Sequence, residues 1–190
     1  MTTAEVRPNQ RDHILDVALR LMSERGAVGM SMRQLAAACD LQVAAIYHYF
    51  ESKDALLAAV VAERQYGTRM ADPLPVDPEA PAAERLRQLF RFVWEGALDE
   101  QAIWRLILGE GMRGEPTVLP VGRELLEILE PAARSWVAQV LPDVDRPDAV
   151  ARLLVGQMLA GFVRHVFEPD RDPAAIAEDS ADTLVAVVLG

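Results

Sequence analysis

Apolar residues recur at helical spacing along most of the chain, with polar residues between them. Ile14, Ala18 and Met22 fall on one face of a helix over residues 9–25, and Gly26 follows as its expected C-cap. The same spacing predicts helices over residues 31–39, 43–49, 53–70, 82–98, 100–109, 118–141, 147–167 and 173–189. The sequence shows no strict alternation bounded by turn residues, which would indicate a strand. The pattern therefore predicts an all-α protein of about nine helices.

Polar residues and prolines mark where these helices begin and end. The stretch Ser31-Met32-Arg33-Gln34 has the S-x-x-Q form of a capping box. Asp40 suits the following turn because Asp tolerates the left-handed conformation, and Ser52 is a good N-cap for the next helix. Four prolines within residues 72–82 predict a connector, and Pro131 is expected to kink or split its helix.

Two short predicted helices joined by a tight turn, over residues 31–50, fit the helix-turn-helix unit. In such a unit the first helix is braced against the core and the second presents side chains to the major groove. The expected inward positions are Leu35, Ala38, Leu41 and Ile46. The expected outward positions are Arg33, Gln42, Val43, Ala44 and Ala45. Small residues at 44 and 45 suit either close approach to base edges or a tight core, and helical geometry leaves both interpretations open.

The segment IYHYFESKDALL, residues 46–57, resembles the end of the DNA-binding region of the TetR family. In that family, a recognition helix closes with a Tyr-aromatic/His-Phe run before a Ser-Lys-Asp/Glu-x-Leu start to the next helix. The upstream stretch SMRQLA and Gly26 match as well, so the resemblance covers about residues 10–58. It implies a three-helix DNA-binding head over residues 1–57 and a helical ligand-binding and dimerisation bundle over residues 58–190.

The resemblance also implies roles for individual residues. Tyr47, His48 and Lys53 would contact phosphates, and a lysine beside a helix N-terminus makes chemical sense as an anion site. Ser31 would cap its helix and can touch phosphate, while Arg33 would reach bases. The variable recognition positions are Gln42, Val43, Ala44 and Ala45. The chain departs from the family at Asp40, where a glycine is common, and at Gln42, where Ser or Thr is the usual cap.

For the C-terminal part, the resemblance implies a small-molecule site and a dimer interface. The expected ligand residues, which suit an apolar cyclic ligand, are Phe90, Trp94, Trp104, Leu108 and Met112. The expected interface residues are Leu153, Gly156, Gln157, Ala160, Arg164, Phe167, Thr183 and Val187. The alternative for both sets is an ordinary intramolecular helical core, and the spacing alone does not exclude it.

Charge and composition narrow the function classes. The net charge is −10, but residues 1–70 hold eight basic and eight acidic residues, so the acidic excess lies in the rest of the chain. A single cysteine, Cys39, excludes a disulfide framework or cysteine metal site within one chain and suits a reducing cytoplasm. We expect no membrane span and no signal peptide, because apolar runs are short and the first residues are polar.

The sequence gives little support to two other functions. A helical enzyme lacks support because the sequence has no H-E-x-x-H, G-x-S-x-G or phosphate-binding glycine loop, and its three histidines are scattered. We therefore expect no catalysis, metal or cofactor. A protein-interaction bundle would leave residues 47–53 unexplained. The resemblance, together with a continuous fourth helix, implies a homodimeric repressor, released from a palindromic DNA operator by a small, largely apolar ligand through movement of that helix.

Overall fold

The computed structural model describes residues 9–64 and 73–190, and every regular element in these ranges is a helix. The chain forms two compact units, one of residues 1–66 with 101–124 and one of residues 67–100 with 125–190. The helices are α1 (Gln10–Gly29), α2 (Met32–Ala38), α3 (Val43–Tyr49), α4 (Lys53–Glu63), α5 (Ala82–Asp99), α6 (Gln101–Met112), α7 (Leu119–Val140), α8 (Pro147–Phe167) and α9 (Pro173–Leu189). The all-α prediction is confirmed.

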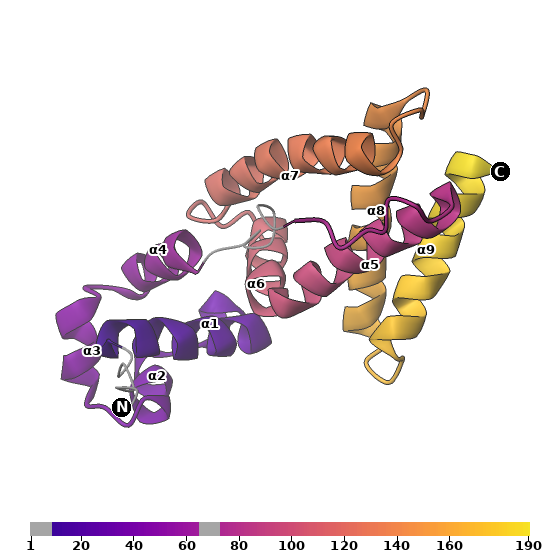
Figure 1. Ribbon diagram of the computed structural model, residues 1–190. Helices are drawn as coiled ribbons and strands as arrows, with labels where there is room; N and C mark the ends of the chain where they lie inside the picture. The colour runs from indigo at the N-terminus through magenta and orange to yellow at the C-terminus, as the bar shows by residue number, and fades with distance from the viewer. Residues whose placement is uncertain (1–8, 65–72) are drawn as a thin grey trace, which may run out of the picture. The chain divides into compact units, whose positions relative to one another are not determined.

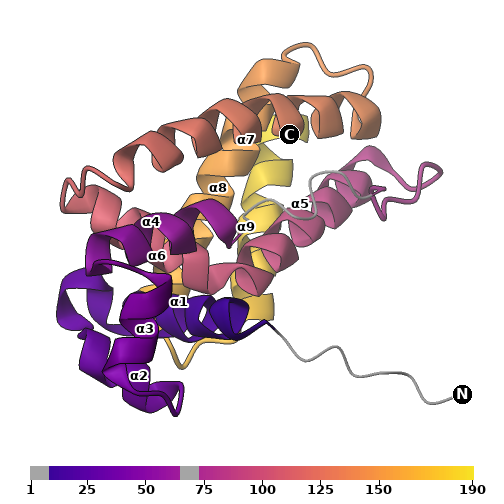
Figure 2. The same ribbon diagram turned by 90° about the vertical axis from the view of Figure 1, so that its left-hand side faces the viewer.

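The first unit is built around α1, which packs against α2, α4 and α6, while α2 and α3 pack against each other (Figure 2). Its core side chains Ile14, Leu15, Leu35, Ile46 and Leu56 are fully buried. Their spacing gives each helix one apolar stripe, and burying these stripes together holds the unit. Residues 101–124 belong to this unit, so the boundaries of the compact units differ from the predicted domain boundary at residue 57. That boundary separates a DNA-binding domain from a ligand-binding domain by function, and it stays a prediction.

Helix α1 is interrupted at Gly26, as its sequence predicts. Gly26 has φ +74° and ψ 158°, outside the helical region, and one further turn follows to Gly29. Met30 is extended and leads into Ser31, the N-cap of α2. Residues 26–30 are called the α1–α2 connector below.

Helix α4 ends at Glu63, so the prediction of one helix over residues 53–70 is wrong at its described end; residues 65–70 lie outside the described residues. The next residue, Arg64, has φ −91° and ψ 92°. Its guanidinium donates to the Asp12 carbonyl at 2.6 Å and pairs with the Asp16 carboxylate at 2.8 Å. These bonds fasten Arg64 to α1, an interaction that the apolar spacing of α4 cannot reveal.

In the second unit α8 and α9 lie side by side, and α5 packs against both (Figure 1). Phe90 and Phe162 are buried in its core, and a Cβ placed on Gly161 would lie 3.0 Å from the Trp94 ring. Helix α8 is long and apolar enough to cross a membrane. A single helix of this kind is weak evidence for a membrane span, because the core helix of a soluble protein passes the same test. Pro131 is expected to kink or split its helix; α7 continues through it, so the helix is not split there, and the kink stays a prediction.

Candidate nucleic-acid interface

The start of α2 and the turn after it have the geometry that the sequence predicts. The Ser31 hydroxyl accepts a hydrogen bond from the Gln34 backbone N–H at 3.2 Å, and the Gln34 side chain accepts one from the Ser31 backbone N–H at 2.9 Å. This reciprocal pair is a capping box. Asp40 has φ 55°, which confirms that it occupies the left-handed turn position.

One side of helix α3 is buried in the core of the first unit, and the opposite side is exposed to solvent. Ile46 is fully buried and Phe50 is 3% exposed, whereas Ala44 and His48 are exposed. Ala44 is therefore not a core residue, while Ala45 is half-buried. As expected for a weak cap, Gln42 makes no side-chain capping hydrogen bond within the part of the chain that the structure describes.

One predicted inward position of α2 is wrong. Ala38 is exposed, and Ala36 and Cys39 are buried beside Leu35. Met32, Leu35, Ala36 and Cys39 lie within one arc of the helix surface, with Leu35 at its edge, and Ala38 lies beyond that edge on the solvent side. Burial raises the pKa of the Cys39 thiol, which opposes formation of the thiolate.

All nine predicted DNA-binding residues lie in the first unit, at the start of α2, along α3 and at the start of α4. The exposed ones are Ser31, Arg33, Gln42, Ala44, Tyr47 and His48. The half-buried ones are Val43, Ala45 and Lys53. One exposed arginine, two exposed aromatic rings and small side chains therefore cover the outer side of this helix pair, which suits a groove with phosphates at its edges.

Lys53 has a structural contact that sequence reasoning missed. Its Nζ atom donates to the carbonyl oxygens of Val28 and Met30, each at 3.0 Å. The Lys53 side chain thus fastens the start of α4 to the α1–α2 connector. A lysine ammonium has three donors, and these bonds use two of them.

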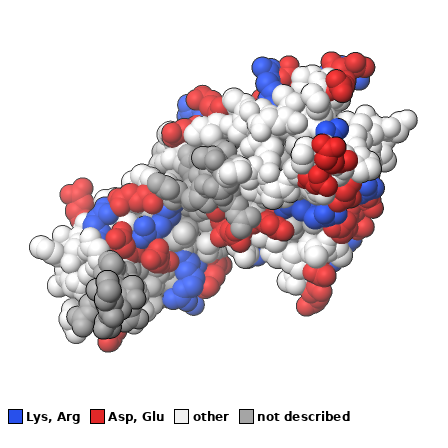
Figure 3. All heavy atoms as spheres, in the orientation of Figure 1, with Lys and Arg blue, Asp and Glu red and all other residues white. Residues whose placement is uncertain are grey.

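Further polar contacts fix α3 and α4 on α1. The Tyr49 hydroxyl donates to Gln10 at 3.0 Å, and the Arg11 guanidinium lies 5.2 Å from the centre of the Phe50 ring. Arg11 also forms a two-pronged ion pair with Glu63. The hydrogen bond from Arg11 holds the pKa of Glu63 below its ordinary value. On the face drawn in Figure 3, acidic and basic side chains lie next to one another.

The predicted dimer residues lie on α8 and α9 and are exposed or half-buried within the second unit. Phe167 is 80% exposed and Val187 is 63% exposed. Gln157, Arg164 and Thr183 also line a cavity of about 130 Å³ between these helices. By contrast, the buried stripe of α9, with Ile176, Ala177 and Leu184, belongs to the intramolecular core.

The predicted ligand residues are divided between the two units. Phe90 and Trp94 are buried on α5 in the second unit. Trp104, Leu108 and Met112 lie on α6 in the first unit, where Trp104 is buried, Leu108 is half-buried and Met112 is 85% exposed.

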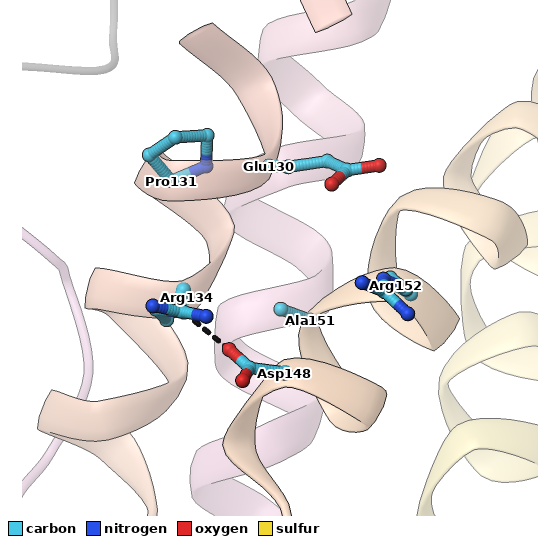
Figure 4. Close-up of a pocket in the computed structure, with 6 residues that line it drawn as sticks. All are labelled: Glu130, Pro131, Arg134, Asp148, Ala151 and Arg152. Atoms are coloured by element: carbon cyan, nitrogen blue, oxygen red, sulfur yellow. Dashed lines mark ion pairs between the residues drawn. The ribbon is translucent and has the colours of Figure 1, made fainter. Parts of the chain in front are cut away.

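A separate cavity of about 260 Å³ lies between α7 and α8 in the second unit (Figure 4). It is lined by Glu130, Pro131, Arg134, Asp148, Ala151 and Arg152. Arg134 and Asp148 form an ion pair across it. This charged, balanced lining differs from the apolar site that the sequence predicts. Among the described residues, no cluster of three His, Cys, Asp or Glu side chains has metal-binding geometry.

The N-terminal helices match a known family. Residues 14–60 match the model of "Bacterial regulatory proteins, tetR family". A protein of Xanthobacter autotrophicus described as an HTH-type transcriptional regulator in the dhlA 5' region is 37% identical over 83 residues, which are 42% of this chain and 41% of that relative. The HTH-type transcriptional regulator BetI of Brucella anthropi is 24% identical over 192 residues, covering 97% of this chain and 95% of the relative.

Solved structures share the fold along nearly the whole chain. A TetR-like transcriptional regulator from Rhodococcus sp. RHA1 aligns with TM-score 0.69 and 24% identity, covering 97% of this chain and 98% of that one. AibR, solved in complex with isovaleryl coenzyme A and operator DNA, aligns with TM-score 0.60 and 23% identity, covering 92% and 97%. The fold of these regulators is therefore present here.

Proposed function

We propose that this chain, which is a helix-turn-helix transcriptional regulator of the tetR family, is a homodimeric repressor that leaves a palindromic operator when a small, largely apolar ligand binds. The observation that carries the proposal is the outer side of α3. Its inner side chain Ile46 is fully buried, while Ala44, Tyr47 and His48 are exposed. A helix anchored in this way can enter the major groove without disturbing the core.

Operator binding would use two kinds of contact. Arg33, exposed near the start of α2, can bridge a guanine edge with two hydrogen bonds. Tyr47 and Lys53 would fix the register by contacting phosphates on either side. The net neutrality of residues 1–70 supports this assignment, since the acidic excess of the chain lies elsewhere.

Dimerisation would use the outer face of α8 and α9. Phe167, Val163 and Val187 are 80%, 51% and 63% exposed, which is costly for a single chain in water and suits a symmetric contact. Two copies of the head would then read two half-sites about one helical turn apart.

The effector would be a small molecule with a largely apolar body, acting on the protein in the cytoplasm. AibR, which shares the fold, was solved with both isovaleryl coenzyme A and operator DNA, so a protein of this fold can hold a small molecule as well as DNA. In this chain, α6 carries three of the predicted ligand residues and packs against α1 in the first unit. A ligand that contacts α6 would therefore act on the unit that carries α3. A coupling of about 1–3 kcal/mol would change operator affinity severalfold or more.

The test is selection of bound sequences from a random duplex library, followed by gel shifts with the selected sequence and a shuffled control. The proposal predicts a sequence with two-fold symmetry, bound by two chains. Salt should weaken specific binding steeply, because phosphate contacts release counterions. Equal binding to the selected and shuffled duplexes at low salt would refute the proposal.

A further inference from the structure

The α1–α2 connector, residues 26–30, is fastened at its N-terminal end by a carboxylate of α6. Glu110 is 2% exposed and is the only charged residue buried among residues 9–64 and 73–190. Its Oε1 atom accepts a hydrogen bond from the Ala27 backbone N–H at 2.7 Å and one from the Arg113 guanidinium at 2.9 Å. A buried carboxylate is tolerated only when it is paired in this way.

Gly26 makes the approach of Glu110 feasible. A Cβ at Gly26 would lie 3.1 Å from Glu110 Oε1 and 3.3 Å from the Arg113 guanidinium, tighter than ordinary contact. Gly26 also has φ +74°, a conformation that side chains rarely adopt. The kink in α1 and the seat of the carboxylate therefore depend on the same glycine.

The C-terminal end of the connector is fastened by Lys53, which donates to Val28 and Met30. Directly after Met30 comes Ser31, whose hydroxyl caps α2. The connector thus joins three parts of the first unit: α6 through Glu110, α4 through Lys53, and α2 through its cap.

We propose that Glu110 is a positioning residue for operator binding, a role that rests on the proposed function. The hydrogen-bond donors to Glu110 are Ala27 and Arg113, and neither is a predicted DNA-binding residue. It acts through the connector, whose position sets both the N-terminus of α2 and the carbonyl groups that hold the Lys53 ammonium. Without the carboxylate, the Ala27 N–H loses its partner and the connector becomes more mobile. The start of α2 and the Lys53 ammonium are then no longer fixed relative to each other, so base and phosphate contacts cannot form together as well.

The test compares Glu110→Ala and Glu110→Gln with Glu127→Ala, an exposed glutamate on α7, as the control. Affinity for the selected operator is measured in gel shifts, with dimer mass and helix content recorded alongside. We expect Glu110→Ala to weaken specific binding about tenfold, because the loosened connector would have to be ordered again when the protein binds the operator. Glu110→Gln, which keeps an acceptor for Ala27, should restore most of the affinity, and Glu127→Ala should bind as the wild type does.

Hydrogen exchange on the DNA-free protein separates this inference from the proposed function. Glu110→Ala should speed exchange at Ala27 and also at residues 31–34 and 53–56, with α8 and α9 unchanged. If the wild type binds no operator, the proposed function fails. If the wild type binds and Glu110→Ala binds equally well, or exchange rises only at Ala27, the inference is overturned. Should Glu110→Ala not fold, Glu110→Asp, one methylene short of Ala27, replaces it with the same expected results.

Discussion

The ammonium of Lys53 lies 3.0 Å from the carbonyl oxygen of Met30, so the lysine that resembles a phosphate contact also holds the backbone before α2. A charged donor on two carbonyl groups fixes where the remaining N–H points. The structural role of Lys53 can be separated from its proposed DNA-binding role by comparing its substitution with that of Tyr47, which is 49% exposed.

Replacing Lys53 with Ala should lower both stability and operator affinity. The loss of its two backbone hydrogen bonds should cost about 1–3 kcal/mol in the free energy of unfolding. Tyr47→Ala should change stability by no more than about 0.5 kcal/mol, because the side chain is exposed, yet should weaken operator binding. Urea unfolding and gel shifts measure the two effects. Unchanged operator affinity in Tyr47→Ala would contradict the assignment of that residue.

Arg33→Ala should relax sequence preference at one base pair of each half-site. A bidentate arginine contributes about 1–3 kcal/mol of discrimination against a wrong base. Operator selection repeated with the variant measures this loss. Arg25→Ala is the matched control. Arg25 is exposed on α1, and its replacement removes the same charge. An unchanged sequence preference in Arg33→Ala would contradict the base contact proposed for Arg33 and would leave only α3 to contact bases.

Phe167→Glu should convert a dimer into a monomer. The proposed contact would bury the Phe167 side chain of each copy, and a carboxylate buried there without a partner is costly. Light scattering should show a mass falling from about twice 20.9 kDa to about 20.9 kDa. Leu126→Glu, a change at a 53% exposed residue of α7, should leave the dimer intact. A dimer that survives Phe167→Glu would place the interface elsewhere.

Gly161→Ala should destabilise the protein relative to Gly111→Ala. Both glycines are helical, and Ala gains up to about 1 kcal/mol of helix propensity over Gly. At Gly111 no atom lies within 4 Å of an added Cβ, whereas at Gly161 the Trp94 ring lies at 3.0 Å. We expect the two free energies of unfolding to differ by about 1 kcal/mol or more. Equal values would mean that the contact between α5 and α8 is looser than described.

The Arg11–Glu63 ion pair should contribute stability that acid removes. The pKa of Glu63 is lowered by its hydrogen bond from Arg11, so the folded state favours the ionised carboxylate. This contribution is present above the ordinary glutamate pKa and is lost as the pH falls through the lowered pKa of the folded state. The contribution is small because the pair is largely solvent-accessible. Melting temperatures of the wild type and Glu63→Gln should therefore differ at pH 7 and converge in acid; a constant difference would exclude this role.

The sequence revealed features that depend on neighbouring residues. The capping box of Ser31 and Gln34, the left-handed turn at Asp40 and the buried stripe through Leu35 and Ile46 are short-range consequences of residue type and spacing. The exposure of Ala38 cannot be predicted in the same way, because the apolar stripe is narrow and an alanine fits either side of a short helix.

Contacts between residues far apart in the chain cannot be predicted from local sequence patterns. Glu110 and Ala27 are 83 residues apart, and no local pattern predicts that a buried carboxylate will meet that N–H. The end of α4 likewise depends on bonds from Arg64 to α1. Periodicity placed Trp94 and Trp104 on helix faces, but it could not reveal that their helices belong to different compact units.

The most direct test of the central claim is a gel-shift titration of the wild type with its selected operator at low salt, against a shuffled duplex of the same composition. We expect a complex of two chains per operator, formed at least about a thousandfold more tightly than the complex with the shuffled duplex. Equal affinity for the two duplexes, or no complex with either, would contradict it.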